Sequence, residues 1–212
     1  MSEVLDGLKA GMRRFREEVY PERAELYQRA VNEAQRPDTL MITCADSRIQ
    51  PEELLQTDPG QVFVTRNIGN IVPAYGEMMG AVSAVLEYAV SALEVKHLVV
   101  CGHTDCGAMK ALLHPSSTEG MPTVTRWLQN AHTALAVAEA RVNQGESANL
   151  LQTLTEQNVL LQMQHVLTHP SVAGAVARGK LTLSGWVYDI GAGEVRICED
   201  GSGVFKRLTN ED

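Results

Sequence analysis

The stretch "TLMITCADSR" at residues 39–48 joins a short apolar run to a thiol, a carboxylate and a guanidinium. The apolar part, residues 39–43, predicts a buried strand that Cys44 follows. Similar β-type runs recur at residues 61–67 and 96–102, and each is followed by a stretch of helical character. This alternation predicts a parallel sheet that is covered on both faces by helices.

The rest of the chain fits the same α/β pattern. Helices are expected at residues 51–57, 76–93, 106–113, roughly 122–143 and roughly 147–169. Residues 180–190 and 194–198 are β-type runs on either side of the turn "GAG", which predicts an antiparallel hairpin. The predicted fold is α/β, with a mostly parallel central sheet flanked by helices, an N-terminal helical arm and a C-terminal antiparallel hairpin.

The N-terminal segment carries an apolar stripe. Apolar side chains recur there at three- to four-residue steps, which predicts one face of an amphipathic helix, at Val4, Leu8, Met12, Phe15 and Val19. A second helix is expected to begin at Pro21. Such a stripe must pack either on its own domain or on a second subunit.

Length and charge limit the kinds of protein that this chain can be. Its 212 residues and 44% hydrophobic content suit a single domain, residues 1–212. A net charge of −8 argues against a nucleic-acid partner, because proteins that bind phosphate backbones concentrate Lys and Arg. We expect a cytoplasmic protein with no membrane partner, because no signal-peptide pattern and no membrane-spanning apolar run is evident. The four cysteines are expected to be reduced.

Three possible metal ligands follow two of the predicted strands. Cys44 follows the first, and His103 and Cys106 follow the third in "GHTDCGAM". Taken singly, such residues are more often a small buried thiol or a hydrogen-bonded imidazole. Because ligands bind beyond the carboxyl ends of parallel strands, the three together indicate a metal site. Two thiolates and one imidazole suit zinc, and they leave a fourth position open. The start of the following helix is expected to lower the pKa of Cys106.

Asp46 and Arg48 lie close to this predicted site and are expected to form a charge-assisted pair. Asp46 has two options. It either binds the metal as a fourth ligand and closes the site, or is held off by Arg48 so that water takes the fourth position. An open zinc site lowers the pKa of bound water to about 7 and so supplies a hydroxide nucleophile. An ordinary surface ion pair is the alternative interpretation.

The motifs "CADSR" and "GHTDCGAM", joined by "PGQVFVTRNIGNIVP" and "LEYAV", resemble those of the β-class carbonic anhydrases. The resemblance runs from about Gln35 to Met109, with "GWVYD" near the C-terminus. The front and back of the chain are similar to bacterial members that group with the plant enzymes, including those associated with cyanate breakdown. The resemblance implies a zinc enzyme that interconverts carbon dioxide and bicarbonate by attack of zinc-bound hydroxide. It implies zinc ligands at Cys44, His103 and Cys106, and a catalytic dyad of Asp46 and Arg48.

The resemblance also implies a substrate pocket of Gln35, Phe63 and Tyr88, which the family takes from the neighbouring subunit of a homodimer or a dimer-based higher oligomer. Residues 1–36 would then be an N-terminal arm that embraces the partner. From the sequence alone, Phe63 and Tyr88 are equally compatible with the core, and Gln35 with a helix cap.

Two positions differ from the family pattern or leave a role open. Some bacterial members close the site when bicarbonate fills a second pocket of a Trp, an Arg and a Tyr. Here Arg66 and Tyr188 match, but Met41 stands at the Trp position, so we expect an open site at neutral pH. Asp105 lies where the family often has a small polar or uncharged residue. Its carboxylate would either face the metal and raise the pKa of the water, or face solvent with no effect.

Two alternatives to carbon dioxide hydration stay open at this stage. The same site could act on another cumulene, such as carbon disulfide or carbonyl sulfide. The chain could also be a non-catalytic zinc or thiol sensing module in which Asp46 closes the site permanently. The presence of Arg48 beside Asp46 favours an enzyme, because a structural site has no need of an Arg that holds off its fourth ligand.

Overall fold

A computed structural model describes residues 2–76, 80–199 and 201–209. Within these residues, six strands form one sheet in the order β2-β1-β3-β4-β5-β6. Neighbouring strands from β2 to β4 run parallel, and β5 and β6 continue the sheet antiparallel. The α/β fold, the mostly parallel sheet and the terminal hairpin are therefore confirmed. The strands are β1 Thr39–Cys44, β2 Val62–Asn67, β3 His97–His103, β4 Thr182–Asp189, β5 Glu194–Cys198 and β6 Lys206–Arg207.

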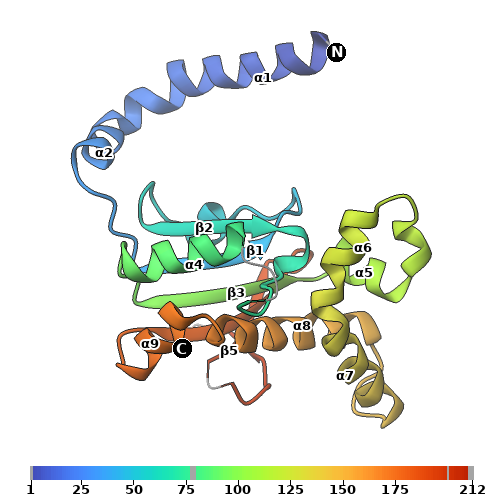
Figure 1. Ribbon diagram of the computed structural model, residues 1–212. Helices are drawn as coiled ribbons and strands as arrows, with labels where there is room; N and C mark the ends of the chain where they lie inside the picture. The colour runs from blue at the N-terminus through green and yellow to red at the C-terminus, as the bar shows by residue number, and fades with distance from the viewer. Residues whose placement is uncertain (1, 77–79, 200, 210–212) are drawn as a thin grey trace.

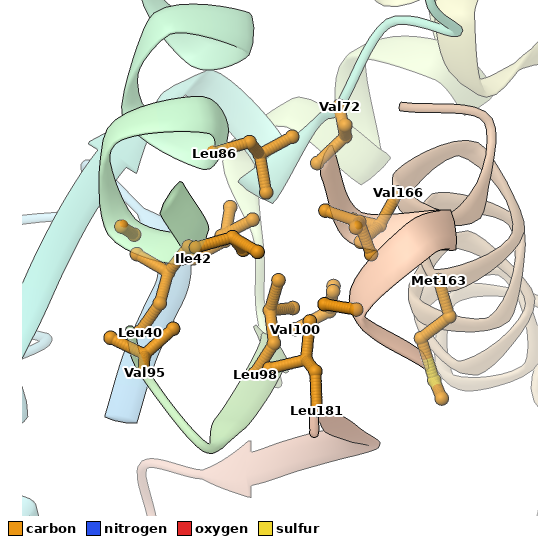
Figure 2. Close-up of a cluster of buried hydrophobic side chains, with 14 of the residues drawn as sticks. Leu40, Ile42, Val72, Leu86, Val95, Leu98, Val100, Met163, Val166 and Leu181 are labelled. Atoms are coloured by element: carbon orange, nitrogen blue, oxygen red, sulfur yellow. The ribbon is translucent and has the colours of Figure 1, made fainter. Parts of the chain in front are cut away.

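One face of the sheet packs against three helices, α4 Ala81–Ser91, α8 Leu150–Leu167 and α9 Pro170–Ala177. Figure 2 shows alternate residues of β1 and β3 pointing into the same buried cluster as Leu86 of α4 and Val166 of α8. Because side chains alternate across a strand, the residues between them face the other side of the sheet. There Met41, Val99 and Cys101 pack against the short helix α3 Pro51–Leu55.

The N-terminal helices form an arm that stands away from the sheet (Figure 1). Helix α1 Ser2–Arg14 continues through a π-helical turn, η1 Phe15–Val19, into α2 Tyr20–Asn32. Pro21 occupies the first turn of α2, as predicted. Most of the predicted stripe is exposed in this chain, at Val4 (73%), Leu8 (66%), Met12 (68%) and Val19 (42%). Phe15 is half-buried, and its ring contacts the rings of Tyr20 and Tyr27 within the arm. The part of the stripe from Val4 to Met12 is therefore open to solvent in the described part of this chain.

Three further helices lie at the end of the sheet to which β1 and β3 lead, at the right of Figure 1. They are α5 Gly107–Leu113, α6 Pro122–Leu128 and α7 His132–Asn143. The single helix predicted over 122–143 is wrong, because a 3₁₀ turn, η4 Gln129–Ala131, separates α6 from α7. The side chain of Asn130 donates to the Trp127 carbonyl over 2.8 Å within this break. Short 3₁₀ turns also occur at η2 Ile68–Asn70 and η3 Pro115–Thr118.

The helix predicted over residues 76–93 is shorter than expected, because α4 covers Ala81–Ser91 and residues 77–79 lie outside the described residues. Helix α9 and strand β6 have no counterpart in the sequence predictions. Among the described residues, no helix combines the length and apolar character needed to cross a membrane.

Candidate metal centre

The topology brings the ends of two neighbouring strands together at one site. Cys44 is the last residue of β1 and His103 is the last residue of β3, which is paired with β1. Cys106 precedes the first turn of α5. The two sulfur atoms lie 4.0 Å apart, and one ligand atom from each of the three residues lies within 4.8 Å of the others. All three residues are buried.

The imidazole of His103 is oriented for ligation. Its Nδ1–H donates to the Thr104 carbonyl oxygen over 2.8 Å, which leaves a lone pair on Nε2. In the described part of the chain, Nε2 is buried without a hydrogen-bond partner. An orphaned buried nitrogen is costly unless something binds it. A metal ion fits this group, because two sulfurs and one imidazole nitrogen form a donor set that a borderline-soft ion accepts.

The pKa values of the two thiols are shifted in opposite directions. The hydrogen bond from Cys106 lowers the pKa of the Cys44 thiol to about 4, and backbone amides of Gly69 and Asp46 act in the same direction. The neighbouring Cys44 sulfur, together with burial, raises the pKa of Cys106. The predicted lowering of the pKa of Cys106 is therefore wrong. The amides of Ala108 and Met109 do lower it, but the adjacent thiolate has the larger effect.

Asp46 and Arg48 form a bidentate ion pair at the edge of this group. Arg48 Nε donates to Asp46 Oδ1 over 2.9 Å, and Nη2 donates to Oδ2 over 2.7 Å. The backbone N–H of Arg48 also donates to Asp46 Oδ1. These bonds hold the pKa of Asp46 well below its usual range. Asp46 Oδ2 lies 4.0 Å from His103 Nε2, and Asp46 is not part of the close group of possible ligands.

Arg66 hydrogen-bonds to the backbone of the loop that carries Cys44 and Asp46, a role that the sequence analysis missed. Its Nε donates to the Cys44 carbonyl over 3.1 Å, and its Nη2 donates to the Asp46 carbonyl over 2.6 Å. Met41 is fully buried, and Tyr188 packs against its cluster. Arg66 thus fixes the backbone between a possible ligand and the dyad.

The carboxylate of Asp105 contacts two basic side chains, Arg48 and Lys110. It accepts a hydrogen bond from Arg48 Nη1 over 3.0 Å and pairs with Lys110. Both alternatives considered for Asp105 from the sequence therefore omit its main contacts. A regular spacing signal could not reveal the contact with Arg48, because it joins two loops that are 57 positions apart in the chain.

Comparison with known proteins identifies the family. The profile of the carbonic anhydrase family matches residues 39–195. A carbonic anhydrase of Pseudomonas aeruginosa is 43% identical over 98% of this chain and 92% of its own length. The solved structure of the β-carbonic anhydrase CcaA matches with a TM-score of 0.91 and 34% identity, over 98% of this chain and 93% of that one. The chain belongs to the β-class carbonic anhydrases. A third match is a tetrameric β-carbonic anhydrase from Sordaria macrospora, with a TM-score of 0.65 and 28% identity over 92% of this chain and 94% of that one.

As a β-carbonic anhydrase, the chain is an enzyme of carbon dioxide hydration, but the three predicted pocket residues lie away from its own metal group. The rings of Phe63 and Tyr88 contact each other, with centroids 6.0 Å apart. Phe63 pairs with Leu40, four residues before Cys44, so it lies about 13 Å back along the sheet. Gln35 is exposed and precedes β1 at the opposite edge.

Proposed function

We propose that zinc is the metal of this carbonic anhydrase, and that Cys44, His103 and Cys106 hold it. The observation that carries the proposal is the buried, unpartnered Nε2 of His103 beside two sulfur atoms that lie 4.0 Å apart. Zinc prefers thiolate and imidazole ligands, and three protein ligands are typical of its catalytic sites. When bound, zinc supplies a Lewis acid that lowers the pKa of water toward neutrality.

The dyad has two roles in this proposal. The ionised carboxylate of Asp46 accepts a hydrogen bond from the attacking water and so orients the water's lone pair toward the carbon of carbon dioxide. Arg48 keeps that carboxylate ionised, because it donates to both carboxylate oxygens. The same two bonds hold Asp46 away from the metal position and leave a coordination position free. The proposed site is therefore open at neutral pH.

The substrate pocket is proposed to form between subunits. Gln35, Phe63 and Tyr88 would line the site of a partner subunit in a homodimer or a larger dimer-based assembly. Their distance from the metal group of their own chain supports this proposal, as does the exposed stripe on the N-terminal arm, residues 1–36. The tetrameric Sordaria enzyme provides a related precedent. We further propose that residues 1–212 form one domain and that the enzyme acts in the cytoplasm.

Replacement of Arg48 separates the proposed enzyme from a zinc or thiol module that does not turn over. Arg48→Ala should retain zinc and lose most carbon dioxide hydration, because it frees Asp46 to reach the metal. Arg141→Ala is the matched control, since Arg141 also forms an exposed ion pair, with Glu146. Metal analysis and stopped-flow hydration on both variants provide the readouts. Full activity in zinc-loaded Arg48→Ala would contradict the proposed dyad.

A further inference from the structure

Arg48 lies between two carboxylates that come from two different strand ends. Asp46 follows β1 and holds one side of the guanidinium. Asp105 follows β3 and holds the other side, with Nη1 donating to Asp105 Oδ2 over 3.0 Å and Nη2 donating to the Asp105 carbonyl over 3.2 Å. A long, exposed Arg side chain with one partner would sample several rotamers. Two opposed partners restrict it to the orientation that engages Asp46.

The backbone of Asp105 is shaped for this contact. Its φ is +60°, in the left-handed region that Asp and Asn tolerate better than most other residues. This conformation directs both the carbonyl oxygen and the carboxylate of Asp105 to the same guanidinium. The other carboxylate oxygen pairs with Lys110 of α5. Lys110 thus orients Asp105, and Asp105 in turn orients Arg48.

We propose that Asp105, oriented by Lys110, is a positioning residue that holds Arg48 against Asp46 and so keeps Asp46 away from the metal. The inference rests on the proposed function of the dyad. Both oxygens of Asp46 are engaged by Arg48, and one of them lies only 4.0 Å from His103 Nε2. Loosening Arg48 therefore releases a carboxylate that lies beside the group of possible ligands. Asp105 biases the site toward its open form without touching the substrate.

The test measures how free the fourth coordination position is, independently of turnover. Cobalt(II) is substituted for zinc, and azide is titrated in while the visible absorption of the cobalt is followed. Asp105→Asn keeps a residue that tolerates the left-handed backbone but removes the charge. Lys110→Met removes the partner of Asp105. Glu146→Gln is the matched control, because it removes an exposed, paired carboxylate elsewhere.

Asp105→Asn should weaken azide binding by about fivefold, because apparent affinity falls with the fraction of molecules whose position is free. Lys110→Met should weaken it in the same direction by a smaller factor. In an Asp46→Asn background, Asp105→Asn should have no further effect, since the competing carboxylate is absent. A merely structural role for Asp105 would weaken azide binding in both backgrounds.

Two results would overturn the inference. One is an azide affinity in both Asp105→Asn and Lys110→Met equal to that of Glu146→Gln. The other is a loss of azide affinity on Asp105→Asn replacement that is equally large in the wild-type and Asp46→Asn backgrounds. If Asp105→Asn does not fold, the azide affinity of Lys110→Met, compared with that of Glu146→Gln, decides whether the inference holds. Failure of the proposed function would be seen separately, as wild-type protein that binds metal and azide but does not hydrate carbon dioxide.

Discussion

Gly69 offers a sharp test of how the fold builds the metal centre. Its backbone amide lowers the pKa of the Cys44 thiol, and its carbonyl accepts a hydrogen bond from Asn158 over 3.0 Å. Its φ is +78°, and a Cβ at this position would lie 2.9 Å from the Cβ of Ala108 and 3.3 Å from the Met109 Cε. Gly69→Ala therefore combines backbone strain with a clash against α5, which begins just after Cys106.

The expected cost follows from these two contributions. An Ala in the left-handed region costs roughly 1 kcal/mol. Overpacking against a Cβ that cannot rotate away adds about 1–3 kcal/mol. We expect Gly69→Ala to lower the free energy of unfolding by about 2–4 kcal/mol. Because the amide of Gly69 favours the thiolate form of Cys44, a proposed ligand, zinc affinity should fall by about 10–100-fold.

Gly60→Ala is the matched control for this prediction. Gly60 has a φ of +92°, yet nothing lies within 4 Å of the position of its Cβ. Its replacement should lower the free energy of unfolding only by the backbone strain, about 1 kcal/mol, and leave zinc affinity unchanged. Urea unfolding of the metal-free proteins and competition with a zinc chelator measure both quantities. Equal losses of stability for the two variants, or wild-type zinc affinity in Gly69→Ala, would refute the reasoning.

Three further predictions concern the thiols and the subunit interface. Zinc binding should release about one proton at pH 8, because Cys44 is already a thiolate while the raised pKa of Cys106 keeps it a thiol. Zinc affinity should therefore rise with pH, and calorimetry in buffers of different ionisation enthalpy should not show two protons. Burial raises the pKa of Cys101 to about 12, so iodoacetamide should leave it unmodified in the native protein at about pH 8, and rapid labelling detected by mass spectrometry would contradict this. If each site takes residues from two subunits, co-expressed Cys106→Ser and Tyr88→Ala chains should be more active than either variant alone. Activity no greater than that of the better variant would argue against a shared pocket.

The parts of this fold that follow from short-range patterns were predictable. The β-type runs that became β1, β2 and β3 are compact and well separated. The convergence of Cys44 and His103 follows from them, because the carboxyl ends of neighbouring parallel strands meet at one edge. The break between α6 and α7 was not predictable in the same way. It involves a side-chain hydrogen bond from Asn130 within a stretch of otherwise helical residues.

The supporting interactions of the site were beyond sequence reasoning for a related reason. The contacts of Arg48 with Asp105 span 57 positions in the chain. The close approach of Gly69 to Ala108 likewise depends on how η2 packs against α5. Periodicity reveals which face of an element is buried, but it does not reveal which loops meet. The acidity of Cys106 was mispredicted because the local helix start was weighed without the sulfur of Cys44 beside it.

The most direct test of the account is stopped-flow hydration of carbon dioxide between about pH 6.5 and 9, on protein whose zinc content has been measured. We predict about one zinc per chain and fast hydration that is already measurable near pH 7. The hydration rate should rise toward alkaline pH, because zinc held by two thiolates lowers the pKa of bound water less than zinc held by neutral imidazoles would. Activity that appears only above about pH 8 would show that Asp46 closes the site despite Met41. Fully zinc-loaded protein that is inactive at every pH would contradict the central claim.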